Sequence, residues 1–496
     1  IRSRTIRLIR NNLHLINDEF RADPINKALF IEIFRQPKGV NASLKRMYSY
    51  GILGAYLPVF QKISGLMQFN IFHSYTVDEH TLLVIRNLRR FFVDEHAYEF
   101  PTAHQVAQNI CKPEILLLAG LFHDIAKGRE GAHEVLGAQD AKEFCFKHNL
   151  SEKDSELISW LVLKHLDFSY VAQKKDLSDP EVIKQFAEHV GTQEKLDYLY
   201  LLTLADVLST SKDVWNDWKN QLFLQLYNNT TQALDASSTV PRDRVKQAIY
   251  NKEKARELLQ KRSISTQDYQ DFWSAFDHTD FFNRQTAPEI ARITKNLYHE
   301  NEPQPQLNII GKTQRGATEL MIYMPDRDYL FAQITNAIDK LNLNIVEAKI
   351  YSGENGKTLV IIYLLDSENE IIEDKARLDE ITETLRYELS LSDPSPASRQ
   401  PQPRRIRIFD TPTEITFHQK DEQMTELIIH TKDIPGLLAR IGQAFKTCGI
   451  RVHDAKINTV GEKAEDVFLI SSIKEKSINT AECKENLTAT LIDAIE

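Results

Sequence analysis

Apolar residues in the first 300 positions recur at spacings of three and four, the period of a helix with one buried face. The pattern is clearest in five segments, at residues 6–16, 82–92, 115–125, 157–166 and 196–208. Glycine and proline are sparse there, and long alternation of apolar and polar residues is absent. The pattern therefore predicts an all-α region.

The pattern changes after a polar, proline-bearing linker at residues 301–305. Alternating β-branched and aliphatic residues then predict strands at 319–324, 344–351 and 359–365, with helices between them. A second linker, rich in proline and serine, follows from residue 392. Beyond it we expect a helix at 437–448 among strands at 426–431, 450–457 and 467–472.

The two strand-containing segments are copies of one repeat. A shift of 107 residues places Thr318-Glu319-Leu320 on Thr425-Glu426-Leu427 and Ala348-Lys349-Ile350 on Ala455-Lys456-Ile457, without a gap. Each copy predicts the element order βαββαβ, so the region is an internal duplication of a small α+β fold.

This order resembles the ACT domain, a small regulatory fold that commonly binds amino acids. In the second copy the resemblance rests on Asp433, Ile434, Pro435, Gly436 and Leu437. Gly436 allows close backbone approach at a helix N-terminus, where free N–H groups and the helix dipole suit a ligand carboxylate. The first copy has Tyr329 at the glycine position, which leaves its ligand pocket open to question. For both copies, a module for interaction or dimerisation is the alternative.

Composition narrows the classes of function. The net charge of −9 disfavours a broad nucleic-acid surface, which usually makes a chain basic. No stretch approaches the roughly 20 apolar residues that cross a bilayer, and no signal peptide is visible. Four scattered cysteines fit a reducing cytoplasm better than a disulfide framework. The chain begins with Ile1 rather than methionine, and we expect it to be part of a longer protein.

The strongest chemical signal is the pair His123-Asp124 at the end of an apolar helix. Burying this pair is costly unless a charge compensates, and a divalent cation does so because imidazole and carboxylate are natural metal ligands. A hydrogen-bonded pair at a helix end would explain the dipeptide alone. Further candidates on other predicted helices favour a metal site: His80, His133, His165 and Asp206.

The order His…His-Asp…Asp across a helical region resembles the HD phosphohydrolase superfamily. The resemblance implies one metal ion held by His80, His123, Asp124 and Asp206, and a second held by His133 and His165 with Asp124 as the bridge. Magnesium or manganese is expected, in one or two positions. Asp124 and Lys127 are the predicted catalytic residues, since Lys127 could reach a substrate phosphate. A solvated lysine at a helix end is the alternative for Lys127.

These ligands predict hydrolysis of a phosphoester or phosphodiester. A divalent metal can lower the pKa of bound water to ~7, and two metals ~3.5–4 Å apart can hold the attacking and leaving oxygens. Neither a Ser/His/Asp triad nor a P-loop is apparent in the sequence.

The chain as a whole resembles the C-terminal part of the bifunctional uridylyltransferase/uridylyl-removing enzymes of bacterial nitrogen control. The segments that carry this resemblance are residues 50–58, 73–81, 120–128, 325–332 and 412–417. The resemblance implies that the HD domain releases UMP from a tyrosine of the signal protein P-II and that the ACT pair senses glutamine. The family's nucleotidyltransferase signature is not found in the chain, so we do not expect transferase activity from it.

The resemblance also predicts the domain organisation: a helical arm at 1–70, an HD domain at 71–215, a helical connector at 216–300, a first ACT domain at 306–391, a linker at 392–405 and a second ACT domain at 406–496.

Two other functions stay open. Enzymes that hydrolyse ppGpp also join an HD domain to an ACT domain, but their HD motif typically continues into an acidic pair, whereas Ala126 and Lys127 stand here. A non-catalytic sensor is the other alternative, and the complete set of ligands argues against it.

Overall fold

A computed structural model gives the fold of the chain and describes residues 3–67, 75–210, 215–235, 243–298, 305–391, 412–421, 423–460, 463–473, 478 and 480–495. Its contacts divide the chain into two compact units. The first comprises residues 1–172, 185–215 and 223–236, and the second comprises residues 173–184, 216–222 and 237–496. His73, residues 301–304 and the predicted linker at 392–405 lie outside the described residues.

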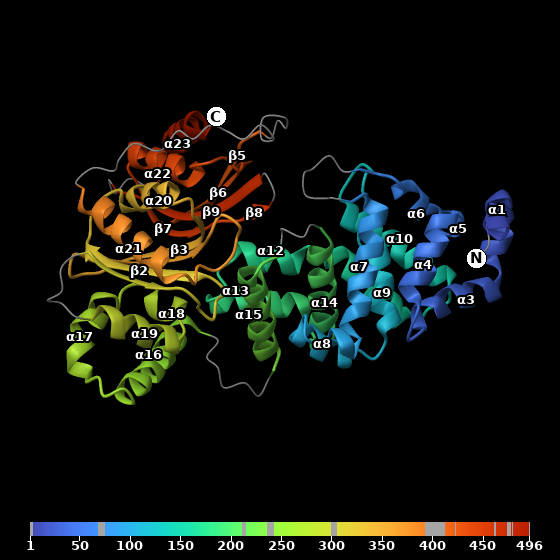
Figure 1. The fold of residues 1–496 in the computed structure, drawn as a ribbon, viewed down its shortest axis with the longest axis horizontal. Coiled ribbons are helices and arrows are strands. Elements are labelled where there is room, and N and C mark those ends of the chain that lie inside the picture. Colours follow the sequence, from blue (N-terminus) through green and yellow to red (C-terminus); the bar gives the residue numbers. More distant parts are fainter. Residues whose placement is uncertain are drawn as a thin grey trace. The chain divides into compact units, whose positions relative to one another are not determined.

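The part of the chain before the first strand is helical, as the spacing of apolar residues predicts (Figure 1). Its described helices, which include two short 3-10 turns, are α1 (Ser3–Asn11), η1 (Leu13–Leu15), α2 (Asp18–Ala22), α3 (Pro24–Arg35), α4 (Val40–Tyr50), α5 (Ile52–Tyr56), α6 (Pro58–Ile63), α7 (Val77–Phe91), η2 (Asp94–His96), α8 (Pro101–Gln108), α9 (Pro113–Phe122), α10 (His133–Lys147), α11 (Glu152–Lys164), α12 (Asp167–Lys174), α13 (Pro180–Val190), α14 (Gln193–Thr210), α15 (Asp217–Leu234), α16 (Arg244–Gln260), α17 (Thr266–Ala275), α18 (Phe281–Arg284) and α19 (Ala287–Leu297).

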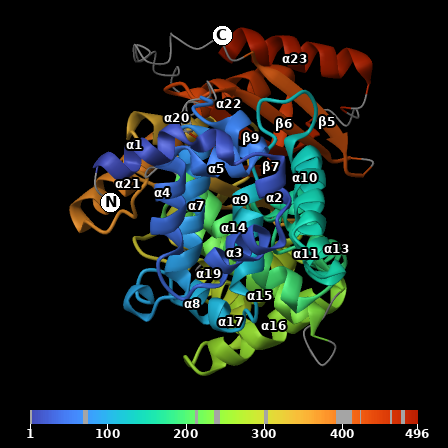
Figure 2. The ribbon, with the colours of Figure 1, turned by 90° about the vertical axis from the view of Figure 1, so that its right-hand side faces the viewer.

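Helix α9 forms the centre of the first unit. It begins at Pro113, whose fixed φ suits the first helical position, and every side chain from Ile115 to Phe122 is buried. Figure 2 shows α7 and α14 beside it, and α7 packs against both. A Cβ at Gly120 would lie 2.7 Å from a methyl carbon of Leu88, so glycine allows α7 and α9 to approach closely. This packing brings the end of α9, where His123 follows, to the start of α7.

The second unit contains one nine-stranded antiparallel sheet in the order β1-β2-β4-β3-β7-β9-β6-β5, with β8 paired to β9. Its strands are β1 (Gln306–Ile310), β2 (Thr318–Pro325), β3 (Asn344–Ser352), β4 (Lys357–Leu365), β5 (Glu414–Gln419), β6 (Thr425–Lys432), β7 (Ile450–Lys456), β8 (Thr459–Val460) and β9 (Lys463–Ser472). The helices among them are α20 (Leu330–Lys340), α21 (Lys375–Ser390), α22 (Leu437–Cys448) and α23 (Ala481–Ile495).

Strand β2 shows why the sheet is covered on both faces. Successive side chains of a strand point to opposite faces. Leu320 and Ile322 belong to one apolar core, which includes residues of α20 to α23. Met321 and Tyr323 belong to a second core, formed with residues of α16 to α19. The sheet of the first repeat is therefore buried between two helical layers.

Apart from the short β8 of the second repeat, each repeat has the order ββαββα, which differs from the predicted βαββαβ at its ends. The central βαββα of the prediction is present in both repeats. The extra strand precedes this core, because β1 and β5 each form an antiparallel pair with the strand that follows. Such neighbouring strands need only a short connection to pair.

The two repeats meet at a short seam between β3 and β7. Ala348 lies opposite Ala455, and the flanking pairs join Glu347 to Lys456 and Lys349 to Asp454. The shift of 107 residues that relates the repeats also superposes Ala348 on Ala455. The seam is therefore self-complementary about a pseudo-twofold axis, as in an isologous dimer interface.

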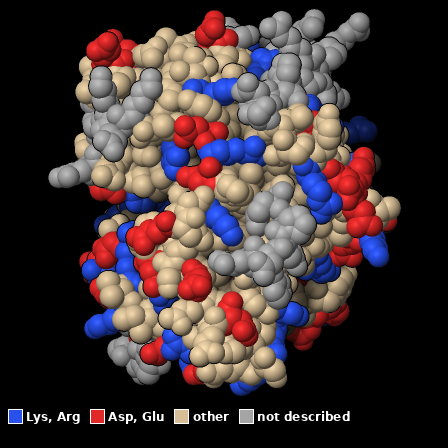
Figure 3. All heavy atoms as spheres, turned by 90° about the vertical axis from the view of Figure 1, so that its left-hand side faces the viewer, with Lys and Arg blue, Asp and Glu red and all other residues tan. Residues whose placement is uncertain are grey.

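Charged side chains of both signs are interspersed over the face of the molecule that Figure 3 shows. In the described part of the chain, no helix combines the length and the apolar character needed to cross a bilayer.

Candidate metal centre

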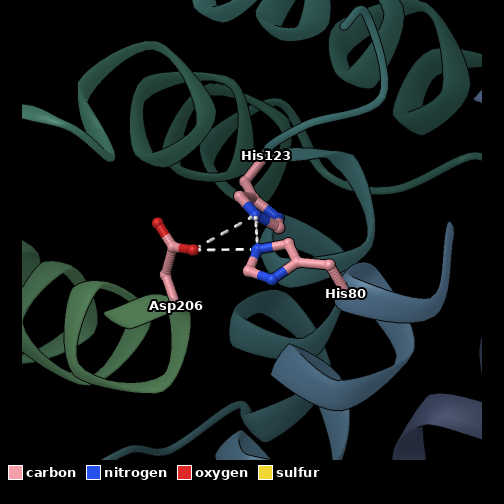
Figure 4. Close-up of side chains that lie close together, drawn as sticks. All are labelled: His80, His123 and Asp206. Carbon is pink, nitrogen blue, oxygen red and sulfur yellow. Dashed lines mark hydrogen bonds and ion pairs between the residues drawn. The ribbon is translucent and has the colours of Figure 1, made fainter. Parts of the chain in front are cut away.

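Three of the predicted ligands converge in the first unit, from helices far apart in the sequence (Figure 4). His80 comes from α7, His123 follows the end of α9, and Asp206 comes from α14. The Nε2 atom of His80 lies 3.3 Å from Nε2 of His123 and 2.9 Å from Oδ1 of Asp206. All three donor atoms thus face a common point, as the ligands of one cation must.

Asp124 joins this group to a second one, made with His133 and His165. Its Oδ2 lies 3.2 Å from Nε2 of His123 and 3.7 Å from Nε2 of His80. Its Oδ1 lies 3.5 Å from Nε2 of His133 and 3.9 Å from Nε2 of His165. The two carboxylate oxygens of Asp124 therefore face two different histidine groups, which is the geometry of a bridging ligand.

Backbone carbonyl groups orient the buried imidazole rings. The Nδ1 atoms of His123 and His165 lie 2.8 and 2.7 Å from the carbonyl oxygens of Gly120 and Val162. Nδ1 of His80 lies 3.3 Å from the carbonyl oxygen of Ser209. When Nδ1 donates its proton to a carbonyl, the lone pair is on Nε2, which points into the site. Metal-binding histidines usually donate such a hydrogen bond from the ring nitrogen that does not face the metal.

The donor set fits a divalent cation. Nε2 of His133 is buried and has no hydrogen-bond partner among the described residues. A buried polar atom without a partner is costly, and a metal ion at this point would satisfy it. Neutral imidazole and carboxylate together suit zinc, manganese or iron, and the carboxylates also suit magnesium.

The protonation states of His165, His133 and Asp124 suit metal binding, whereas His123 has to release a proton when a metal binds. Burial and the neighbouring His123 lower the pKa of His165 to about 4, and burial also lowers that of His133. Burial would likewise lower the pKa of His123, but Asp124 and Asp206 outweigh it and raise the value to about 8. Burial would raise the pKa of Asp124, yet His123 and Lys127 hold it well below its usual range. The bridging carboxylate is therefore ionised at neutral pH.

Lys127 lies against the ligands. Its Nζ atom is 2.7 Å from Oδ2 of Asp124, and its side chain is only 12% exposed. The alternative of a solvated lysine at a helix end is therefore wrong for Lys127, because its ammonium group forms an ion pair with the bridging carboxylate. Its catalytic role stays a prediction.

Comparisons with known proteins identify the domain that contains this site and the domains on either side of it in the sequence. The HD domain family matches residues 77–211, and the families described as the third and fifth domains of uridylyltransferase GlnD match residues 1–56 and 243–296. Bifunctional uridylyltransferase/uridylyl-removing enzymes are 71% identical over 496 residues in Hydrogenovibrio crunogenus, 41% over 498 in Methylococcus capsulatus and 42% over 504 in Nitrosococcus oceani.

The chain corresponds to the C-terminal portion of this enzyme family. Each of the three alignments covers the whole chain, which spans 56–57% of the length of these relatives. The resemblance predicted from the sequence is confirmed, as is a helical HD region followed by an α+β region consistent with two ACT-like domains. The six domain ranges stay a prediction.

The ACT-like region of this family member places the predicted ligand residues at one turn. Gly436 has a φ of 73° and precedes α22, which begins at Leu437. Asp433 is partly buried, and the carboxylate of Asp339 lies beside Gly436 at the turn. In the first repeat, Tyr329 adopts the same left-handed conformation, with a φ of 66°. The turn is therefore conserved in shape between the repeats although the residue differs.

Asp466 is a buried acid of this region that sequence reasoning missed. Asp466 on β9 is 0% exposed; its Oδ1 accepts from the N–H of Asn458 at 3.3 Å, and its Oδ2 has no hydrogen-bond partner among the described residues. The predicted strand began at Val467, whereas β9 begins at Lys463, so Asp466 was left outside the predicted strand. The alternation of buried Ala464, Asp466 and Phe468 is the signal that could have revealed it.

We expect Asp466 to make the protein less stable as the pH rises. Burial and the charge of Asp433 raise its pKa to about 8, from 3.8 for an ordinary aspartate. The folded state therefore favours the protonated carboxyl, and this contribution is complete below pH ~4 and lost as the pH rises through about 8. Asp466→Asn should remove a pH-dependent loss of up to about 1.4 kcal/mol per pH unit.

Chemical denaturation at pH 5 and pH 8 measures this difference. Asp379→Asn, on the exposed face of α21, is the control for loss of one carboxylate. An unchanged pH dependence in Asp466→Asn would contradict the assignment.

Proposed function

We propose that the HD domain hydrolyses a phosphodiester and that its substrate is the uridylylated tyrosine of the P-II signal protein. The observation that carries the proposal is the position of Asp124, with one oxygen toward His80 and His123 and the other toward His133 and His165. The names of the relatives include uridylyl removal. A tyrosyl-UMP bond is a phosphodiester with a phenol leaving group of pKa near ~10, which needs less protonation than an alkoxide.

Each residue has a distinct part in this reaction. A divalent metal, when bound, would lower the pKa of its water to ~7 and stabilise charge on phosphate oxygens. His80, His123 and Asp206 would hold one metal position, His133 and His165 a second, and Asp124 both. Lys127 keeps Asp124 ionised and brings one positive charge to the site.

Exposure of the ligands indicates the side from which substrate enters. His80, His123 and His165 have side chains at most 1% exposed, whereas Asp206 is 20% and His133 25% exposed. The open side of the centre is therefore the side of Asp206 and His133. We expect the tyrosyl-UMP group to approach there.

The regulatory part of the proposal is that glutamine binds the ACT-like region and alters UMP release. A ligand shifts a conformational equilibrium only by its difference in affinity for the two states. The turn at Asp433 to Leu437 is the proposed site, because it is the turn that carries glycine. A cytoplasmic location, with magnesium or manganese as the metal, belongs to the same proposal.

Release of UMP from uridylylated P-II tests the function. We expect the purified chain to release UMP, chelation to abolish release, and manganese or magnesium to restore it. His133→Ala should lower the bound metal from two ions per chain toward one and slow release, while His14→Ala, an exposed histidine of η1, should change neither.

Release that persists in metal-free protein would overturn the metal-dependent mechanism. Hydrolysis of ppGpp without release of UMP would show that the substrate is ppGpp and not uridylylated P-II.

A further inference from the structure

The first metal position, formed by His80, His123 and Asp206, depends on how two helices pack against each other. His80 comes from α7 and Asp206 from α14, and the two residues are 126 positions apart in the sequence. Their facing atoms, Nε2 and Oδ1, lie 2.9 Å apart. The side chains of a functional site have to be held to within about 0.5 Å. A small slide or rotation of α7 against α14 would therefore separate the two ligands.

Asn87 and Ser209 form a hydrogen-bonded bridge between the same two helices. Nδ2 of Asn87 donates to Oγ of Ser209 at 2.9 Å, and this hydroxyl donates to the carbonyl oxygen of Ala205 at 2.6 Å. Oδ1 of Asn87 accepts from Nη2 of Arg86 at 3.4 Å. Both bridging residues are buried. The amide of Asn87 thus has a partner at each end, which fixes its direction.

The bridge lies on the same side of each helix as a metal ligand. Asn87 follows His80 by seven residues on α7, and Ser209 follows Asp206 by three residues on α14. At 3.6 residues per turn, spacings of seven and three return to nearly the same face of a helix. The bridge therefore stands about two turns from one ligand and about one turn from the other, where the helices meet.

Ser209 also contacts His80 through its main chain. The carbonyl oxygen of Ser209 lies 3.3 Å from Nδ1 of His80, whose Nε2 faces Asp206. A displacement of the last turn of α14 would move Asp206 and would also move the acceptor that orients the ring of His80. Ser209 thus connects Asn87, through its hydroxyl, to His80, through its carbonyl group.

Packing alone does not explain a polar pair at this place. The buried neighbours of Asn87 one turn away on α7, Val84 and Phe91, are apolar. Replacing both partners of a buried hydrogen bond by apolar groups of the same shape can be nearly neutral for stability. A hydrogen bond differs from an apolar contact in its fixed length and direction. In coiled coils a buried asparagine fixes the register of two helices in this way, at a cost in stability.

We propose that Asn87 and Ser209 are positioning residues of the metal centre. Their hydrogen bond holds α7 and α14 in the register at which His80 and Asp206 face one cation. The inference rests on the proposed function, because it concerns the metal centre of the proposed hydrolase. The second position takes His133 from α10 and His165 from the end of α11, so it should depend less on this bridge.

Calorimetric titration of manganese into the metal-free chain tests the proposal. We expect Asn87→Leu and Ser209→Ala each to weaken the binding of one of two manganese ions by about 10- to 100-fold, the usual effect of losing a residue that supports a metal ligand. Because both substitutions remove the same bond, the double variant should lose little more affinity than the more affected single variant. The manganese concentration that gives half-maximal UMP release should rise by a similar factor, while kcat at saturating manganese changes less.

Tyr198→Phe is the matched control on α14. Tyr198 is buried, and its hydroxyl donates to the carbonyl oxygen of Lys112 at 3.2 Å, eight residues before Asp206 in the sequence. This variant also loses a buried hydrogen bond of the helix, and it should keep the manganese affinity of the wild-type chain. Melting temperatures of the metal-free variants check that each is folded.

Unchanged manganese binding by folded Asn87→Leu and Ser209→Ala would overturn the inference. So would additive losses in the double variant, or an equal loss in Tyr198→Phe. If the expected losses of manganese affinity occur but the wild-type chain releases no UMP, the proposed hydrolase function fails and the positioning role stands.

Discussion

Asp124→Asn should abolish most phosphodiester hydrolysis and remove metal from both positions of the HD centre. The amide keeps the shape of the side chain but not its charge, and Asp124 is the residue that faces all four histidines. Substitution of a residue that hydrogen-bonds to a metal ligand typically lowers metal affinity or activity by about 10- to 100-fold. Loss of a bridging ligand should therefore lower kcat by more than about 100-fold.

Elemental analysis and the rate of UMP release measure this effect together. Asp154→Asn is the control in the same unit, because Asp154 pairs with the exposed Lys112 at 2.7 Å instead of facing the centre. We expect that variant to keep its metal and its activity. If Asp124→Asn keeps full metal content and activity, the bridging assignment is wrong.

Arg284→Met should destabilise the second unit by about 3–5 kcal/mol, the cost of leaving a buried ion pair without one partner. Arg284 is 7% exposed, and its guanidinium donates to Asp176 at 2.7 Å and to Asp454. Without it, two carboxylates near the seam of the sheet lose their shared cation. Urea denaturation followed by circular dichroism measures the loss.

The matched control is Arg386→Met on α21. Arg386 is half exposed and pairs with Glu383 at 2.7 Å, and pairs of this kind contribute about 0–1 kcal/mol. A loss for Arg284→Met as small as that of the control would show that the buried network contributes little to folding.

The regular elements were the most predictable part of this protein. Helix α22 has the predicted bounds, because an apolar stripe is followed by Gly449, whose φ of 67° suits a helix end. Strands β2 and β3 match their predictions to within one residue at both ends, and β4 begins two residues earlier than predicted. The edge strands β1 and β5 were not predicted, because an exposed edge lacks the continuous burial that marks a central strand.

The sequence predicted which residues form the metal centre, but not the distances and contacts between them. His80, His123, Asp124, His133, His165 and Asp206 were all named from their order along helices, and the structure brings them into two adjoining groups. The contact of Lys127 with Asp124 was not foreseen, although the two are three residues apart. Asp466 was missed because the predicted strand began at Val467, so this residue was not placed on the buried face of β9.

The seam between β3 and β7 bears on how steeply the protein would respond to the concentration of an effector. Two separate copies joined by such a seam would be identical, so both would bind effector and could respond cooperatively. Covalent tandem repeats are free to diverge, and here Tyr329 and Asn344 of the first repeat stand where Gly436 and Arg451 stand in the second. With the proposed glutamine site in the second repeat alone, we expect one effector molecule per chain and a hyperbolic response, spread over a wide range of effector concentration.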